Sequence, residues 1–358
     1  MPSRTIVGTL SLSVEQPNTP TRPPLLMLHG LFGGAWYFEK YLRFFAALGW
    51  PAYALDVRGH HGSRPVADLG KVGIADFVAD ATEASSWIAA RHEMQRPVVI
   101  GHSMGGLLAQ KLAEADTVSA AVLLCSAPPR GIMLVTPTLL LKQVKHLPAL
   151  LGSRALEGTP ADHEELTFNR VPEGERAALV ARLVPESGRV GREISLGTTR
   201  VDARAVRCPV LCVSAADDRF VPARVGARLA AKYHASHWVE PSHAHFIPWE
   251  PGWEQPAVDI ERWLAHVVRR AADVGRQDAL WRELKALIGD LVELAFFDGY
   301  TVRAELLSAP DGTGRRRVVY AVVEVKRPGE RARYMPRHEK ERESSPLEEL
   351  VSVRAMDS

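Results

Sequence analysis

Cysteine is scarce in this chain of 358 residues, which contains only Cys125, Cys208 and Cys212. An odd number excludes a framework in which every cysteine is paired. Cys208 and Cys212 stand four apart on one predicted strand, too far apart for a bridge or a shared metal. Because all three lie in or beside apolar runs, we interpret them as buried free thiols of a reducing compartment. This indicates a cytoplasmic protein.

Excess charge and long apolar runs are also absent. The chain has 44 basic and 42 acidic side chains, so nothing points to a nucleic-acid or anionic-membrane partner. No stretch approaches the ~18 apolar residues of a membrane span, and the N-terminal residues lack the apolar core of a signal peptide. Hydrophobic residues make up 46% of the chain, and the length suggests about two domains. We therefore predict a soluble protein with a large core.

Short apolar runs alternate with helical patterns through the first 270 residues. An alternating stretch at 5–14 predicts a half-buried edge strand. Further strands are predicted at 25–28, 52–55, 98–100, 120–124, 210–213 and near 238–239, and helices at 36–48, 74–92, 107–114, 223–232 and 253–272. Strands that alternate with long helices indicate an α/β fold with a doubly wound, mostly parallel sheet.

The alternation breaks between residues 129 and 207. Helix-like apolar stretches at 139–151 and 166–183 are interrupted there by prolines. We predict an inserted helical cap over this segment, with the two parts of the core at 1–128 and 208–270.

The chain changes character again over residues 271–358. Helical spacing of leucines from Leu280 to Leu294 is followed by alternating stretches at 300–307 and 318–325. These patterns predict a small accessory helix and a β-hairpin, and the charged tail beyond Lys326 is expected to be partly disordered. This appendage either packs on its own hairpin or forms a contact in a homodimer.

Ser103 lies at the centre of the sequence Gly-His-Ser-Met-Gly, residues 101–105, between a predicted strand and a predicted helix. A nucleophile elbow requires this order of strand, sharp turn and helix, because the turn holds the serine oxygen clear of the sheet. In an alternative interpretation the glycines only pack the helix against the sheet, and Ser103 caps the helix. A serine nucleophile also needs a base, a carboxylate that orients the base, and backbone donors for an oxyanion.

Residues of these types follow the predicted strands in a suitable order. The amide of Met104 and that of Leu31, in a glycine-rich turn after strand 25–28, are candidate oxyanion donors. Two adjacent carboxylates, Asp217 and Asp218, follow strand 210–213, and the loop after the last strand contains His243 and His245. The two histidines lack a third ligand at suitable spacing, so no metal is expected.

This order of serine, aspartate and histidine resembles the α/β-hydrolase superfamily over about residues 5–270. Within it the chain is similar to capped carboxylesterases and lipases, and also to carbon–carbon bond hydrolases. The resemblance favours Asp218, which stands in an Asp-x-x-Val-Pro sequence, and His245, which precedes Glu250 by five places. Segment 56–63 resembles the family's Asp-x-Arg-Gly-x-Gly-x-Ser sequence, with the second glycine displaced by one place to Gly62.

We therefore predict a serine esterase with a triad of Ser103, Asp218 and His245, an acyl-enzyme intermediate and no cofactor. Its expected substrate is a small ester with an apolar acyl or alkyl part. Candidate substrate-binding residues are apolar or aromatic, although each could equally pack in the core: Trp36, Tyr37, Leu140 and Val144. The alternatives are carbon–carbon bond cleavage or acyl transfer by the same triad, and a binding protein that shares the fold without the activity.

Overall fold

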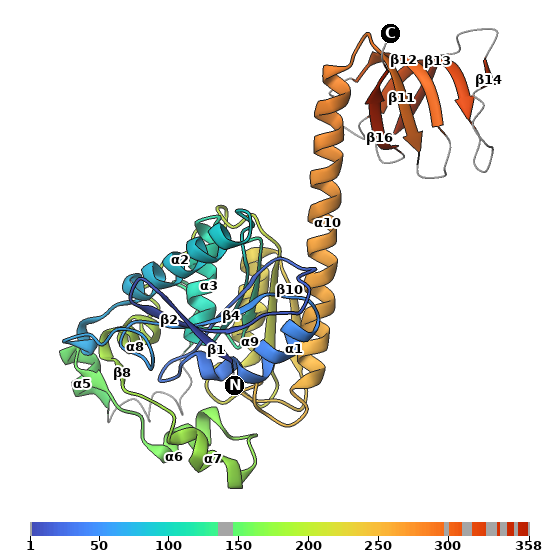
Figure 1. The fold of residues 1–358 in the computed structure, drawn as a ribbon. Coiled ribbons are helices and arrows are strands. Elements are labelled where there is room, and N and C mark those ends of the chain that lie inside the picture. The colour runs from blue at the N-terminus through green and yellow to red at the C-terminus, as the bar shows by residue number, and fades with distance from the viewer. Residues whose placement is uncertain are drawn as a thin grey trace. The chain divides into compact units, whose positions relative to one another are not determined.

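The computed structural model describes residues 2–134, 146–296, 301–309, 317–326, 335–336, 342–346 and 350–356 (Figure 1). By its internal contacts the chain divides into two compact units, Met1–Val268 and Arg269–Ser358. Leu140 and Val144, two of the candidate substrate-binding residues, lie outside the described residues.

The first unit is built on an eight-stranded sheet. Its strand order is β1-β2-β4-β3-β5-β6-β9-β10. β1 and β2 are antiparallel to each other, β2 is antiparallel to β4, and every other neighbouring pair is parallel. The bounds are β1 Ser3–Val7, β2 Leu10–Glu15, β3 Leu25–Leu28, β4 Ala52–Asp56, β5 Val98–His102, β6 Ala120–Leu124, β9 Val210–Ala215 and β10 Ser236–Glu240. The predicted mostly parallel sheet is confirmed.

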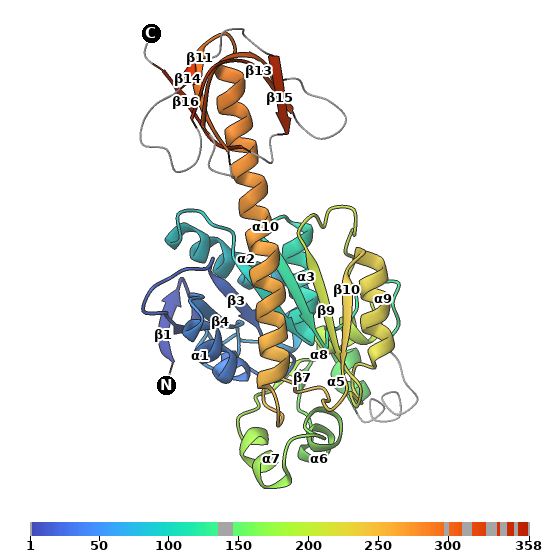
Figure 2. The same ribbon diagram turned by 90° about the vertical axis from the view of Figure 1, so that its right-hand side faces the viewer.

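Helices cover both faces of this sheet, as Figures 1 and 2 show. Residues Leu26 and Leu28 of β3 point into one apolar core, and Leu25 and Met27 point into the other. This alternation explains why the strand is apolar at every position, since both of its faces are buried. The first core is closed by α2 (Ile74–Arg91), α3 (Met104–Glu114) and α9 (Ala223–Tyr233). The second is closed by the 3₁₀ turn η1 (Ala35–Phe38), α1 (Glu39–Ala47) and the first turns of α10 (Glu254–Ala286).

The edge of the sheet differs from the sequence-based prediction. Residues 5–14 were expected to form one half-buried strand, but the chain turns back at Gly8, whose φ is +58°, and forms the β1–β2 hairpin. β2 is almost fully buried because it pairs with both β1 and β4. An alternating pattern cannot reveal such a turn when a single glycine makes it.

The segment between β6 and β9 is a set of short elements. They are α5 (Leu147–Gly152), β7 (Ala155–Leu156), α6 (Pro160–Asp162), the π-helical turn η4 (His163–Thr167), α7 (Glu173–Val180), β8 (Glu186–Ser187) and α8 (Gly188–Ser195); η2 (Leu69–Lys71) precedes α2. The helix-like stretch at 166–183 is interrupted at Pro172, which separates η4 from α7, as its prolines indicate.

The second unit contains the end of α10 and a six-stranded sheet. The order is β14-β13-β12-β11-β16, with β15 also paired to β13. The two strands of each described pair run antiparallel. The predicted hairpin corresponds to β12 and β13. The bounds are β11 Leu291–Phe296, β12 Thr301–Ser308, β13 Arg317–Lys326, β14 Met335–Pro336, β15 Arg342–Pro346 and β16 Leu350–Ala355.

Two expectations for this part of the chain are wrong. The helices predicted at 253–272 and from Leu280 are one continuous helix, α10. Leu291 and Leu294 belong to β11 and not to a helix, because α10 ends at Ala286 and Gly289 turns the chain with a φ of +97°. Within the tail beyond Lys326, β14 and β15 pair with β13, and β16 pairs with β11.

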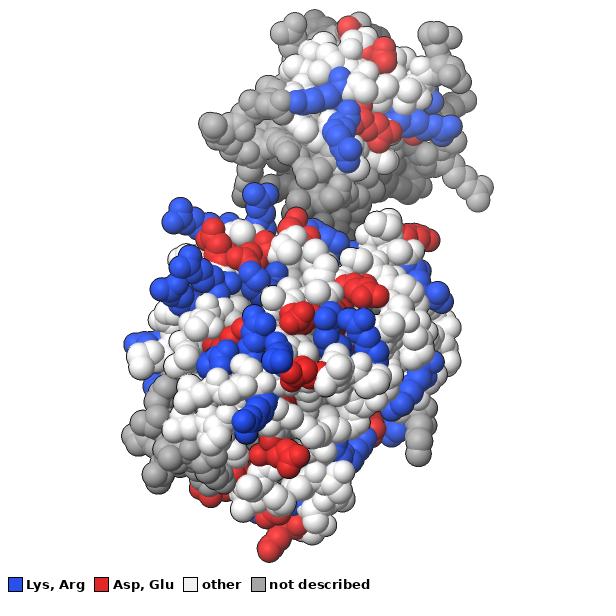
Figure 3. Space-filling view, turned by 90° about the vertical axis from the view of Figure 1, so that its left-hand side faces the viewer, with Lys and Arg blue, Asp and Glu red and all other residues white. Residues whose placement is uncertain are grey.

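The surface charge and the polarity of the helices agree with the balanced charge and the lack of long apolar runs in the sequence. On the face that Figure 3 shows, basic and acidic side chains are interspersed over the first unit. Among the described helices, including the 33-residue α10, none has an apolar stretch of the length that crossing a bilayer requires. The three cysteines form no disulfide; Cys125 and Cys212 are buried and Cys208 is partly exposed.

Candidate active site

Ser103 occupies a strained turn between β5 and α3. Its φ of 54° and ψ of −117° lie in a region that residues other than glycine rarely adopt, and such strain is characteristic of functional sites. The turn is held by three backbone hydrogen bonds: Ser103 donates to the carbonyl of Leu124, and the amides of Gly106 and Ala127 donate to the carbonyl of Ser103. The residue is only 4% exposed.

Two glycines allow this turn to lie so close to the sheet. A Cβ atom on Gly101 would stand 2.2 Å from the carbonyl oxygen of Gly105, and one on Gly105 would stand 2.0 Å from the carbonyl oxygen of Leu28. Both obstacles are backbone atoms, which cannot move aside as a flexible side chain can. The flanking glycines are thus required by packing between helix and strand.

A substitution at Gly105 should show this requirement. We expect Gly105→Ala to lower the free energy of unfolding by about 3 kcal/mol, at the upper end of the usual cost of overpacking. Urea denaturation followed by circular dichroism would measure it. Gly174→Ala is the matched control, because a Cβ atom there meets nothing within 4 Å. Equal stability of the two variants would contradict the packing argument.

His245 and Asp218 form a buried pair. The Nδ1 atom of His245 lies 2.8 Å from Oδ2 of Asp218. The other carboxylate oxygen, Oδ1, accepts hydrogen bonds from the amides of Phe220 and Val221 at 2.8 and 2.7 Å. Asp217, the alternative carboxylate, is instead paired with Arg170 and partly exposed. The structure therefore brings His245 to Asp218 and not to Asp217.

The loop that carries His245 is fixed by Glu250. One oxygen of this buried carboxylate accepts from the amide of Ala244 at 2.7 Å, and the other accepts from the amide of Phe246 at 3.0 Å. Nδ1 of His243 also lies 3.2 Å from Glu250. The backbone is therefore held on both sides of His245, while His243, the alternative base, is engaged by the same carboxylate.

His102 supports the same loop from the elbow. Its Nε2 donates to the carbonyl of His245 at 2.7 Å. Burial and the nearby charge of His245 lower the pKa of His102 to about 3, so the ring stays neutral. Because a carbonyl only accepts, the single ring proton is on Nε2. The residue before the serine thus positions the loop of His245.

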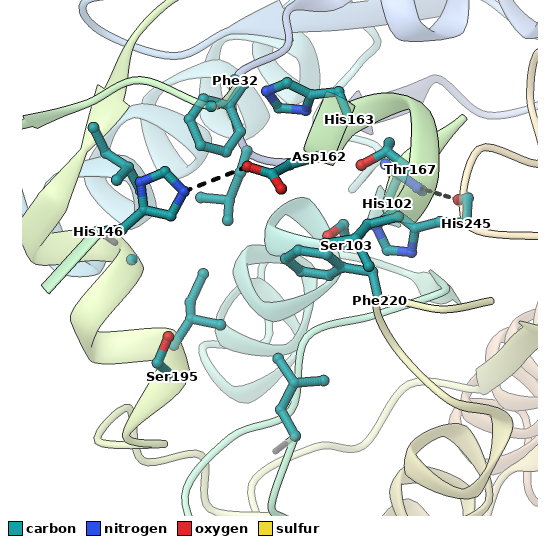
Figure 4. Close-up of a pocket in the computed structure, with 18 of the residues that line it drawn as sticks. Phe32, His102, Ser103, His146, Asp162, His163, Thr167, Ser195, Phe220 and His245 are labelled. Carbon is teal, nitrogen blue, oxygen red and sulfur yellow. Dashed lines mark hydrogen bonds and ion pairs between the residues drawn. The ribbon is translucent and has the colours of Figure 1, made fainter. Parts of the chain in front are cut away.

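Ser103 and His245 line one cavity of about 110 Å³, which Figure 4 shows from within. The two side chains lie on the same side of it, beside Phe220. His146 lies across the cavity, and Asp162, 3.7 Å from His146, stands between. The rest of the wall is mainly apolar. Most of its apolar residues come from the segment between β6 and β9, and two come from the turn after β3: Leu134, Leu150, Leu156, Leu166 and Ile194, and then Leu31 and Phe32.

Of the other candidate residues that the structure describes, some line the cavity and others do not. Leu31 and Tyr37 line the cavity, and Met104 is the first residue of α3, directly after Ser103. Trp36 is not among the lining residues. Its indole N–H donates to His61 at 3.2 Å, and the guanidinium of Arg182 lies 4.3 Å from its ring centroid. Adjacent residues of the 3₁₀ turn point in different directions, so Trp36 and Tyr37 cannot both face the cavity.

Cys125, which was not predicted as a site residue, is a neighbour of the His245–Asp218 pair. Ligand atoms of Cys125, Asp218 and His245 lie within 4.8 Å of one another. Burial, and then the charge and hydrogen bond of Asp218, raise the pKa of the Cys125 thiol well above its usual range. The thiol therefore keeps its proton and is a poor nucleophile. The sequence did contain a signal for this placement. Cys125 directly follows β6, and the carboxyl end of β6 lies at the same edge of the sheet as the end of β5 and the elbow.

Residues 25–263 match the model of the alpha/beta hydrolase family. The chain belongs to this family. A monoacylglycerol lipase of Mycolicibacterium smegmatis is 26% identical over 260 residues, which cover 70% of this chain and 91% of the lipase. A probable alcohol acetyltransferase of Saccharomyces cerevisiae is 32% identical over 108 residues, covering 29% of this chain and 30% of that protein.

Solved structures agree with the fold. The monoacylglycerol lipase of Paleococcus ferrophilus superposes with a TM-score of 0.54 at 22% identity, over 72% of this chain and 99% of the lipase. A thermophilic esterase from Thermogutta terrifontis gives a TM-score of 0.55 at 18% identity, over 74% of this chain and 99% of the esterase. At these identities the structures establish a shared fold.

Proposed function

We propose that this protein is a carboxylic ester hydrolase in which Ser103 is the nucleophile, His245 the general base and Asp218 the residue that orients the base. The observation that carries the proposal is the coexistence of a strained serine elbow and a buried His245–Asp218 pair in one apolar cavity. Nδ1 of His245 faces Asp218, which leaves Nε2 to receive the serine proton.

The reaction would proceed in two halves. Ser103 Oγ attacks the ester carbonyl carbon while Nε2 of His245 takes its proton, and the amides of Leu31 and Met104 hold the resulting oxyanion. The tetrahedral intermediate then expels the alcohol, which receives the proton from His245. Water, activated by the same imidazole, attacks the acyl-enzyme and releases the carboxylic acid and free Ser103.

The cavity supports an apolar acyl or alkyl group in the substrate. Its walls are mainly aliphatic and aromatic, and its volume is below that of a cavity of ~150 Å³ known to bind benzene. Two proteins to which the chain is similar, one by sequence and one by fold, are monoacylglycerol lipases. We propose a small-molecule ester with a short acyl chain as substrate, and a cytoplasmic site of action.

A panel of nitrophenyl esters tests this function. We expect butyrate and hexanoate esters to be hydrolysed with a kcat/KM at least about tenfold above that of the laurate ester, because a cavity of about 110 Å³ offers apolar contacts to a short acyl chain and few more to a long one. Equal turnover of all three would contradict the short-chain substrate. No turnover of any ester, alongside good turnover of a vinylogous diketone, would replace the proposal with carbon–carbon bond hydrolysis.

Acyl transfer to an alcohol is the second candidate. It is favoured by the 32% identity to the yeast protein named as an alcohol acetyltransferase. Product analysis of the same reactions with added ethanol would separate the two: an ethyl ester as the main product in water would indicate a transferase.

A further inference from the structure

We infer that Glu186, which lies between β6 and β9 in sequence, is a positioning residue that sets the direction of the Leu31 amide in the proposed oxyanion hole. The inference rests on the proposed function. Glu186 is the first residue of β8, is fully buried and does not line the cavity. Its carboxylate reaches the turn that follows β3, 154 residues earlier in the chain.

The backbone N–H and carbonyl of Phe32, the residue after Leu31, are both hydrogen-bonded to the segment that contains Glu186. Oε2 of Glu186 accepts from the amide of Phe32 at 3.1 Å, and the amide of Val184 donates to the carbonyl of Phe32 at 2.9 Å. Oε1 of Glu186 accepts from the amide of Ser187 at 2.7 Å, which fixes the carboxylate itself. Phe32 has a φ of 64°, so it needs such restraints to stay in this conformation.

These contacts fix one peptide plane next to the proposed oxyanion donor. The carbonyl of Leu31 and the N–H of Phe32 are the two ends of that plane. The hydroxyl of Tyr37 donates to the carbonyl at 3.1 Å, and Glu186 accepts from the N–H. With the plane held at both ends, rotation about the Cα–C bond of Leu31 is restricted. The direction of the Leu31 N–H, one peptide earlier, is restricted with it.

His60 balances the charge of Glu186. Its Nε2 lies 3.2 Å from Oε2 of Glu186, and its Nδ1 lies 3.1 Å from the carbonyl of Arg58. Burial lowers the pKa of His60, but the charge and hydrogen bond of Glu186, the carbonyl of Arg58 and the charge of Asp56 together raise it by more, and the net shift is upward. His29, whose ring centroid is 5.3 Å away, is kept neutral by burial and by His60. His60 therefore gives the buried carboxylate of Glu186 a hydrogen-bonding partner that compensates for its burial.

The loss of this contact should reduce the rate of the chemical step more than substrate binding. A misdirected oxyanion donor stabilises the transition state less, while the apolar wall that binds the acyl chain stays in place. We expect Glu186→Ala to lower kcat by roughly 10- to 100-fold with KM changed by less than about threefold. Affinity for a trifluoromethyl ketone, whose tetrahedral adduct presents an oxyanion, should fall by the same factor as kcat/KM.

Two further variants at this position separate positioning from folding. Glu186→Gln keeps an acceptor for the Phe32 amide when its oxygen takes the place of Oε2, at the cost of the hydrogen bond from Ser187, and should retain kcat within about fivefold of wild type. Glu186→Asp keeps the negative charge but withdraws the acceptor by one methylene, so it should lose activity as Glu186→Ala does. Glu186→Asp therefore still tests the inference if Glu186→Ala fails to fold.

Glu193→Ala is the matched control. Glu193 is also a carboxylate of this segment that accepts from a backbone amide, that of Ile74 at 2.8 Å, but it contacts neither Phe32 nor the cavity. We expect it to keep kcat within about threefold of wild type. Full kcat and full ketone affinity in folded Glu186→Ala and Glu186→Asp would overturn the inference and leave the esterase proposal standing. Absence of ester hydrolysis in the wild type would overturn the proposed function itself.

Discussion

Replacing Ser103 by alanine should reduce ester hydrolysis by a factor of at least about 10⁴. The serine is the group that forms the covalent bond to the acyl carbon, so its removal ends the two-step reaction and leaves only oxyanion stabilisation and proximity. The decrease should appear in kcat, measured with the best nitrophenyl ester. The variant should also lose all labelling by a fluorophosphonate, which reacts with activated serines.

Ser85→Ala provides the control for this experiment. Ser85 is buried like Ser103, but it lies in α2 and donates to the carbonyl of Thr117 at 3.2 Å, away from the cavity. Its alanine variant should label and turn over ester as the wild type does. Persistent turnover in Ser103→Ala would exclude the acyl-enzyme on Ser103 and would direct attention to water activated by His245.

The sheet could be predicted from the sequence because its signal is local. A strand buried on both faces must be apolar at every position, and 25–28 and 120–124 show this directly. The elbow could be predicted for a similar reason. The glycines on either side of Ser103 are adjacent in sequence to the strand and helix whose approach they permit.

The supports of the site could not be predicted in this way. Glu186 meets Phe32 across 154 residues, and neither residue has a sequence neighbour that would indicate the contact. The different directions of Trp36 and Tyr37 depend on a 3₁₀ turn, which a helical pattern does not distinguish from an α-helix. Strands β14 and β15 have few apolar residues, and their order comes from pairing with β13.

The choice between Asp217 and Asp218 shows what the sequence could predict and what it could not. Both follow the same strand, and either could have reached the loop of His245. Only the resemblance of residues 218–222 to a family sequence favoured Asp218. The physical reason appears in the structure: the amides of Phe220 and Val221 converge on Oδ1 of Asp218 and aim Oδ2 at His245, while Asp217 is engaged by Arg170.

Asp218→Asn should lower kcat by a factor on the order of 10⁴ while the fold is maintained. Two backbone amides donate to Oδ1, so the carbonyl oxygen of the new amide must occupy that position. Its NH₂ group then faces Nδ1 of His245 and donates to it. The ring proton is thereby forced onto Nε2, the nitrogen that has to accept the serine proton, and the base is blocked by its own tautomer.

Asp217→Asn is the control, since it changes the same kind of side chain one residue away and removes only the partly exposed pair with Arg170. It should retain kcat within about threefold. Steady-state kinetics give both values, and ¹⁵N chemical shifts of the His245 ring report its tautomer independently of activity. An Asp218→Asn enzyme with normal kcat, or one whose ring proton stays on Nδ1, would show that the orientation of His245 does not depend on Asp218.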